Sequence, residues 1–188
     1  SFNQPTLNFS KMLLAYFRLE SHNILHIAGS DGSGRTSLIK TIIGTFLYKN
    51  TRKCFILDCE RKYSKSTFSH FIDEKDRIFI NSMAVNISLA DSLKNIRIKL
   101  KMLSQGDVLV INSISEKLKQ SMMNRTSYGD YRSALQIYVN GIIPELIHLV
   151  QERECNVLII HHVSYHPDYD SNMPYFYDLM QMIPGMWV

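Results

Sequence analysis

A glycine-rich turn between an apolar run and a helical pattern constrains this chain more than any other feature. Residues 24–28 form a short apolar run that predicts a strand, and residues 36–48 place apolar side chains at helical spacing. Between them, Gly-Ser-Asp-Gly-Ser-Gly-Arg-Thr follows the phosphate-loop pattern of a glycine, four residues, a glycine, a cation and a threonine. A strand, such a loop and a helix, in that order, predict a nucleotide-binding loop more strongly than a turn that binds nothing.

Each part of this loop has a chemical role in holding phosphate. Glycines let successive N–H groups point at phosphate oxygens, and the following helix adds unpaired N–H groups and the positive end of its dipole. The Thr36 hydroxyl is expected to ligate Mg²⁺, and Arg35 to meet the β- and γ-phosphates of ATP with a poorer fit than lysine. The loop residues predicted to bind nucleotide are Gly29, Ser30, Asp31, Gly32, Ser33, Gly34, Arg35, Thr36 and Ser37.

Apolar runs and helical patterns alternate along the rest of the chain. Further strands are predicted at residues 53–58, 77–80, 108–112 and 156–161, and further helices at 10–19, 89–103 and 131–154. Because the strands are almost uniformly apolar, we expect an α/β fold with a mainly parallel sheet and helices on both faces. A chain of 188 residues, 45% of them hydrophobic, predicts one domain over residues 1–188.

Charge and cysteine content narrow the class of protein. The formal net charge of +4 permits contact with nucleic acid without demanding it. The three cysteines, Cys54, Cys59 and Cys155, are an odd number without metal-ligand spacing, which favours reduced, buried thiols in a cytosolic or nuclear protein. No stretch approaches the roughly 18 apolar residues of a membrane span.

Four motifs in order resemble those of the RecA-type strand-exchange recombinases, in particular their divergent eukaryotic paralogues. The phosphate loop is the first, and residues 55–60 (Phe-Ile-Leu-Asp-Cys-Glu) are similar to the second conserved strand. Residues 108–113 (Val-Leu-Val-Ile-Asn-Ser) are similar to the Walker B strand, and residues 157–163 to the strand that runs into Asn-Gln-Val. The resemblance implies a RecA-like P-loop NTPase core over nearly the whole chain, with ATP and Mg²⁺ as cofactors.

The resemblance also assigns roles to single residues and exposes departures from the family pattern. Glu60 would be the general base that activates water, although a charge at a strand end is an equally good interpretation. Asn112 stands where the family has the Walker B carboxylate, and His162 belongs to a His-His pair that replaces the nucleotide-sensing Asn-Gln. Together with Arg35, the neutral Asn112 predicts a weak ATPase or one that does not hydrolyse ATP.

Two segments correspond to the loops that line the DNA channel in the family. Residues 116–132 carry Lys117, Lys119, Arg125 and Arg132 as candidates for weak DNA binding, and a solvated loop is an equal alternative. Residues 164–186 hold three aspartates and several tyrosines but no lysine or arginine, which favours a protein-binding surface over DNA. His162, His166 and Asp168 could suggest a metal site at the start of this region, but they lack a fourth ligand, so packing and surface roles are favoured.

These observations predict an accessory, or mediator, protein of homologous recombination and DNA repair in the nucleus. Its partners would be recombinase-fold paralogue subunits or the recombinase filament, with single-stranded DNA contacted weakly or indirectly. The alternatives are a stand-alone small P-loop ATPase or kinase, and a pseudo-ATPase that has lost its nucleotide. The kinase is disfavoured because no arginine follows Arg153 to serve a lid.

Overall fold

The central sheet of the protein is parallel, as its apolar strands predict. A computed structural model describes residues 24–48, 51–82, 89–113, 115–117, 128–175 and 177–188. Its strands are ordered β3-β2-β4-β5-β1-β7, and β6 pairs with β5 outside this path. All pairs along the path are parallel. The strands are β1 (Ile24–Gly29), β2 (Cys54–Asp58), β3 (Ile78–Ser82), β4 (Val108–Asn112), β5 (Asn156–His166), β6 (Ser171–Pro174) and β7 (Met186–Trp187).

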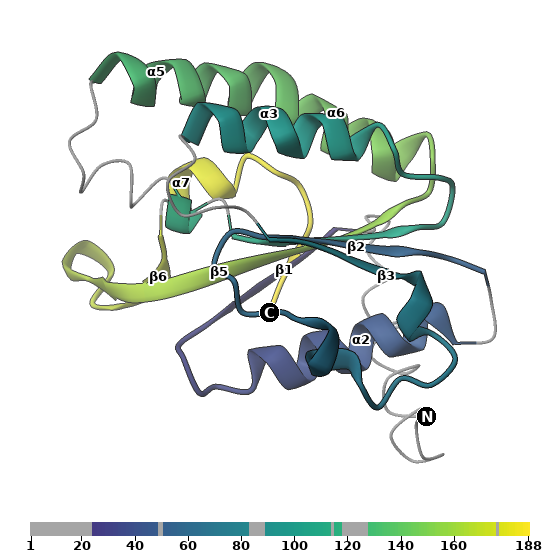
Figure 1. The fold of residues 1–188 in the computed structure, drawn as a ribbon. Helices are drawn as coiled ribbons and strands as arrows, with labels where there is room; N and C mark the ends of the chain where they lie inside the picture. The colour runs from purple at the N-terminus through teal and green to yellow at the C-terminus, as the bar shows by residue number, and fades with distance from the viewer. Residues whose placement is uncertain (1–23, 49–50, 83–88, 114, 118–127, 176) are drawn as a thin grey trace.

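Helices cover both faces of the sheet, which confirms the predicted α/β layering (Figure 1). Helix α2 (Arg35–Leu47) lies on one face. The other face is covered by α3 (Leu89–Leu100), α5 (Tyr128–Ile137) and α6 (Ile143–Gln151). Alternate side chains of β4 therefore enter two cores: Leu109 and Ile111 join the cluster under α3 and α6, whereas Val108 and Val110 join the cluster under α2. Burial on both faces explains why the strands have no polar alternation.

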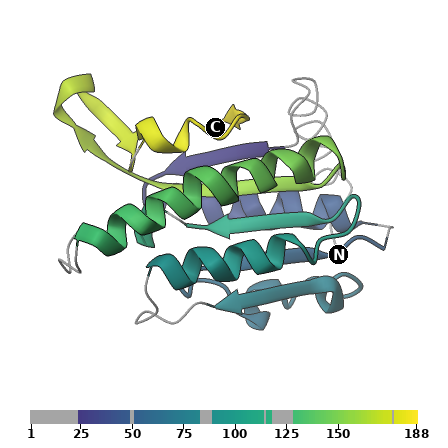
Figure 2. The same cartoon turned by 90° about the horizontal axis from the view of Figure 1, so that it is seen from above.

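The helix predicted at residues 131–154 is one continuous helical segment with a change of winding in its middle. It consists of α5 (Tyr128–Ile137), a π-helical segment at Tyr138–Ile142, and α6 (Ile143–Gln151), and it runs alongside α3 (Figure 2). Pro144 lies in the first turn of α6 and has no N–H to donate, so a regular α-helical bond is lost where the π segment ends. The helix predicted at residues 10–19 lies outside the described residues.

The segment at residues 164–186 was expected to be a loop, and this expectation is wrong. Strand β5 continues beyond the sheet to His166 and folds back through a short 3₁₀ turn (Pro167–Tyr169) onto β6, in antiparallel pairing. Helix α7 (Tyr177–Met180) and β7 follow, and β7 returns to the edge of the sheet beside β1. The error arose because β5 is half exposed after Val163, where polar side chains replace the apolar run.

The basic segment at residues 116–132 also differs from the expected loop. Lys117 lies in a short helical stretch and is only 3% exposed, which corrects its placement on an exposed DNA-binding loop. Arg132 is exposed but belongs to helix α5, and Lys119 and Arg125 lie outside the described residues. Two short 3₁₀ segments, Lys65–Phe68 and Lys75–Arg77, complete the described elements. Across the described ranges, we find no helix whose length and apolarity would suffice to cross a bilayer.

Candidate functional site

The glycine-rich turn joins β1 to α2 at the carboxyl edge of the sheet. Gly34 caps α2 in the left-handed region with φ 89°, and Gly32 has φ 79°, so both positions use the conformational freedom of glycine. No side chain of the described residues caps the N-terminus of α2, which leaves its first N–H groups for a ligand. A Cβ at Gly29 would come within 2.7 Å of the Ser33 hydroxyl oxygen, so the loop closes tightly over its first glycine.

A cavity of about 260 Å³ opens beside this turn. Its walls come from the turn and α2, from the segment after β2, and from the ends of β4 and β5. The residues that line it are Asp31, Gly32, Gly34, Arg35, Thr36, Ser37, Ile39, Glu60, Lys62, Tyr63, Asn112 and Ile160. A crevice outside the carboxyl ends of parallel strands is the usual ligand position in such folds.

The guanidinium of Arg35 is bound at both ends of its fork by groups of the protein. Its Nη1 donates to the carbonyl oxygen of His161 at 3.0 Å, and its Nη2 donates to Oδ1 of Asp31 at 2.9 Å. The side chain is 11% exposed, and the His161 carbonyl in the middle of β5 fixes its direction. Arg35 therefore links the turn to β5. The sequence had predicted only a contact with phosphate for this residue, and not this structural role.

Lys62 brings a second cation to the same carboxylate from across the cavity. Its Nζ donates to Oδ1 of Asp31 at 3.1 Å and lies 3.9 Å from Oε2 of Glu60, and its side chain is 42% exposed. The hydrogen bond and charge of Lys62 hold the pKa of the Asp31 carboxyl below its ordinary value. In this structure Asp31 is the anion that both cations share.

The ends of β2 and β4 are joined by a buried polar network. Asp58 accepts hydrogen bonds from the backbone N–H groups of Tyr63 at 2.7 Å and Glu60 at 3.2 Å, and from Nδ2 of Asn112 at 3.3 Å. These bonds fix the turn that carries Glu60 into the cavity. Oδ1 of Asn112 is buried and has no hydrogen-bond partner among the described residues.

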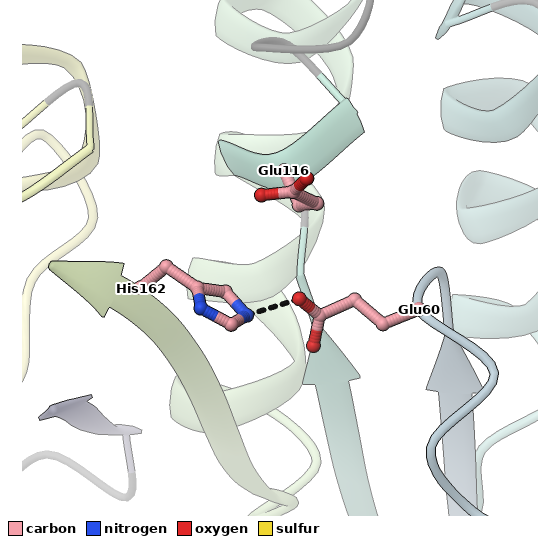
Figure 3. A group of neighbouring side chains, drawn as sticks. All are labelled: Glu60, Glu116 and His162. Carbon is pink, nitrogen blue, oxygen red and sulfur yellow. Dashed lines mark ion pairs between the residues drawn. The ribbon is translucent and has the colours of Figure 1, made fainter. Parts of the chain in front are cut away.

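Glu60 and His162 form an ion pair, and Glu116 lies beside them (Figure 3). The side chains of Glu60 and His162 are 8% and 13% exposed. Burial raises the pKa of Glu60, but the hydrogen bond and charge of His162, with the charge of Lys62, outweigh it and hold the pKa below its ordinary value. A carboxylate that is ionised at neutral pH and held in place can accept a proton or ligate a cation.

His161 points to the opposite face of the sheet from His162 and forms a buried pair with His26. His161 Nε2 lies 2.9 Å from Nδ1 of His26, and Nε2 of His26 lies 3.1 Å from the carbonyl oxygen of Ile183. Because a carbonyl only accepts, His26 carries its proton on Nε2 and accepts from His161. Both rings stack on Trp187, at centroid distances of 4.2 and 4.7 Å.

The structure gathers most of the residues that the sequence analysis singled out. Within one cavity it places most of the phosphate turn with Glu60 and Asn112, and His162 joins through Glu60. Ser30 and Ser33 belong to the turn, where the Ser33 N–H donates to the Ser30 carbonyl at 3.2 Å. Asp107 lies at the opposite end of β4 from Asn112 and from the cavity, where it accepts hydrogen bonds from the N–H groups of Lys53 and Ser104.

Three residues of the site were missed by sequence reasoning. Lys62 follows Glu60 by two positions and could have been found by considering the Glu-Arg-Lys charge cluster as a whole. Tyr63 lines the cavity through a turn that only the Asp58 hydrogen bonds define. Glu116 was treated as the start of a basic loop, and its approach to Glu60 and His162 depends on tertiary structure alone.

Comparison with known proteins assigns neither a family nor a function to this site. The chain matches none of the protein-family models compared with it, and it matches no curated protein. What the site can do is therefore argued from its own residues.

Proposed function

We propose that the protein binds ATP with Mg²⁺ at the turn between β1 and α2. The observation that carries this proposal is a left-handed glycine turn before an uncapped helix N-terminus, open to a cavity at the carboxyl edge of a parallel sheet. The cavity of about 260 Å³ is slightly smaller than a typical small-molecule pocket of roughly 300–1,000 Å³. It suits the polyphosphate, with the base and ribose lying outside it.

The residues available for phosphate and Mg²⁺ follow from the cavity walls. The N–H groups at the start of α2 would hold phosphate oxygens, and the exposed Thr36 hydroxyl would ligate Mg²⁺. Lys62 is the more exposed of the two cations, and Arg35 is held by the His161 carbonyl. We assign Lys62 as the cation that neutralises the terminal phosphate, in exchange for its contact with Asp31.

The same site suits binding better than turnover. Asn112 offers an amide where a carboxylate would hold the Mg²⁺ water shell by charge. Glu60 could act as a general base, but His162 and Lys62 already stabilise its ionised form and so weaken its pull on a proton. ATP bound with Mg²⁺ would supply a phosphoryl group to water, and these residues would favour slow hydrolysis or none.

We further propose that the chain has a RecA-like core and acts as an accessory protein of homologous recombination and DNA repair in the nucleus. The order of the four motifs supports this role, and so does the surface of the C-terminal hairpin. Tyr165 and Tyr169 on this hairpin are 61% and 53% exposed. Residues 164–186 include three aspartates and no lysine or arginine, so this surface repels DNA and favours a protein partner, either a recombinase-fold paralogue or the end of a recombinase filament.

Affinity purification followed by mass spectrometry tests this role. We expect recombinase-fold subunits to co-purify with the wild-type chain, and their recovery to fall severalfold for Tyr165→Ala/Tyr169→Ala, because exposed tyrosines contribute to interfaces far more than to the fold. The melting temperature should be unchanged. As a matched control, Ile98→Ala removes another exposed apolar side chain, on α3, and should leave recovery intact.

Electron microscopy of the purified chain with ATP and single-stranded DNA provides the second arm of this test. We expect no long filaments, because stacked copies would bring the hairpin carboxylates beside phosphates. Continuous filaments of this chain alone would contradict the accessory role and indicate a recombinase in its own right. Brisk ATP turnover without any recombinase partner would instead support the stand-alone ATPase.

A further inference from the structure

Three side chains from distant parts of the sequence converge at the edge of the sheet. Glu60 follows β2, Glu116 follows β4, and His162 lies on β5 (Figure 3). One potential ligand atom from each lies within 4.8 Å of the other two. Because the three come from separate elements, their approach is a product of the fold and not of local sequence.

Two carboxylates and one imidazole meet in this group. Glu60 is 92% buried as a side chain, since its exposure is 8%, and a second carboxylate, Glu116, is beside it. Two carboxylates close together in a partly dry site repel each other, and a bound cation would relieve that repulsion. His162 pairs with Glu60, and Lys62 approaches Oε2 of Glu60 only to 3.9 Å while it donates to Asp31 at 3.1 Å.

A second observation points to the same place. Asn112 is 2% exposed, its Nδ2 is committed to Asp58, and its Oδ1 accepts no hydrogen bond from any described residue. Asn112 lines the same cavity as Glu60. Buried polar atoms are rarely left unpaired, so the Asn112 oxygen indicates a ligand with donors or positive charge.

We propose that Glu60, Glu116 and His162 bind one divalent transition-metal ion, such as Zn²⁺ or Mn²⁺. An imidazole nitrogen with two carboxylate oxygens suits these ions, whereas Mg²⁺ and Ca²⁺ prefer oxygen ligands alone. Three protein ligands leave positions open for water, and a metal-bound water is a donor that could satisfy Asn112. The three cysteines are buried, and the potential ligand group found among the described residues does not include them.

This metal site is distinct from the Mg²⁺ proposed at Thr36, and it does not depend on nucleotide. A metal on Glu60 would occupy the carboxylate that could otherwise activate water. The site therefore gives a further reason for slow hydrolysis while being testable without ATP.

Calorimetric titration of the nucleotide-free protein with ZnCl₂ in excess Mg²⁺ tests the inference. We expect one Zn²⁺ per chain, with affinity reduced at least about tenfold in Glu116→Gln and in His162→Asn, because even residues that only support metal ligands cost that much when replaced. His166→Asn is the matched control, since His166 stands 3.9 Å from Asp168 in a more exposed histidine–carboxylate pair. This control should bind Zn²⁺ like the wild type.

Two outcomes would overturn the proposal: no Zn²⁺ or Mn²⁺ binding by the wild type, or equal binding by the wild type and both ligand variants. Circular dichroism confirms that each variant is folded, and Glu116→Gln keeps the size of a half-buried side chain. The visible spectrum of bound Co²⁺ provides a second readout. Thiolate-to-metal charge transfer would place the ion on a cysteine and contradict the assignment. Loss of ATP binding with Zn²⁺ binding intact would contradict the proposed function and leave this inference standing.

Discussion

His161 and His162 are adjacent on β5, yet they belong to two different kinds of polar cluster. His161 is 0% exposed, bonds to His26 and stacks on Trp187. His162 lies on the other face of the strand, 13% exposed, against two carboxylates. The first cluster pairs its histidines with each other and with a carbonyl, although Nδ1 of His161 has no partner among the described residues, and the second combines charge with an unpaired amide oxygen. Two consecutive residues of one strand thus differ in role: His161 packs in the core, and His162 belongs to the candidate site.

The difference shows how environment, not residue type, decides what a histidine does. Burial lowers the pKa of His26 to about 4 and that of His161 to about 3, because no anion among the described residues offsets the loss of hydration. At neutral pH this pair is uncharged and serves the fold. His162 faces two carboxylates, so it is placed to pair with them or to bind a cation together with them.

Truncating the core pair should have the largest effect on stability. We expect His26→Ala to lower the free energy of unfolding by about 3 kcal/mol, because it removes a buried ring, two hydrogen bonds and a stacking contact. His162→Ala, one strand away, should cost about 1 kcal/mol, since Lys62 and solvent still reach Glu60. Urea unfolding at pH 7 measures both, and equal losses would remove the distinction between the clusters.

The second-largest expected effect is that of acid, which should reduce the contribution of the His26–His161 pair to the free energy of unfolding. The folded pKa of His26 lies below its ordinary value of 6.5, so its contribution is fully present above pH 6.5 and is lost as the pH falls toward 4. Over that range His26 alone accounts for about 3 kcal/mol. His161 faces it and titrates in the same direction.

Unfolding free energies measured between pH 7 and pH 4 test this linkage. His26→Gln should reduce the slope of stability against pH without abolishing it, because His161 remains. An unchanged slope would mean that other groups control the acid response.

Substitutions of charged residues in the cavity beside the β1–α2 turn should change the affinity for ATP and leave the free energy of unfolding nearly constant. We expect Lys62→Met to weaken ATP binding about tenfold at low salt, and less at high salt, because the partly exposed ammonium is screened. Lys65→Met, an exposed lysine nearby in sequence, is the control. If the two variants bind ATP equally, Lys62 is not the phosphate cation.

Asp31→Asn should have the smallest effect, in the opposite direction. Removing the carboxylate that holds Lys62 and Arg35 frees the cations for phosphate and should tighten ATP binding about threefold. Fluorescence titration with a labelled ATP analogue at two salt concentrations measures the change. Weaker binding by this variant would show that Asp31 supports the loop and does not compete with phosphate.

The strands and their sheet could be predicted from sequence because they are buried on both faces. Residues 108–112, for example, are almost continuously apolar, and a short apolar run of this kind is typical of a strand buried on both faces. The glycine-rich turn between β1 and α2 was equally predictable, since its glycines have specific backbone requirements.

The features that sequence reasoning missed depend on contacts between distant segments. The Arg35 bond to the His161 carbonyl joins residues 126 positions apart, and Lys62 meets Asp31 across 31 positions. The hairpin of β5 and β6 is half exposed, so it lacks the apolar run that revealed the central strands. Glu116 reaches Glu60 only because β2 and β4 are paired neighbours.

Calorimetric titration with MgATP decides whether the turn between β1 and α2 holds a nucleotide. We expect the wild type to bind one ATP and Gly34→Ala to bind far more weakly, because a Cβ at φ 89° strains the cap that aligns the α2 N–H groups. Gly106→Ala introduces the same strain at φ 78°, in the turn before β4, and should bind like the wild type. No binding by the wild type, or equal loss in both variants, would contradict a nucleotide site at this turn.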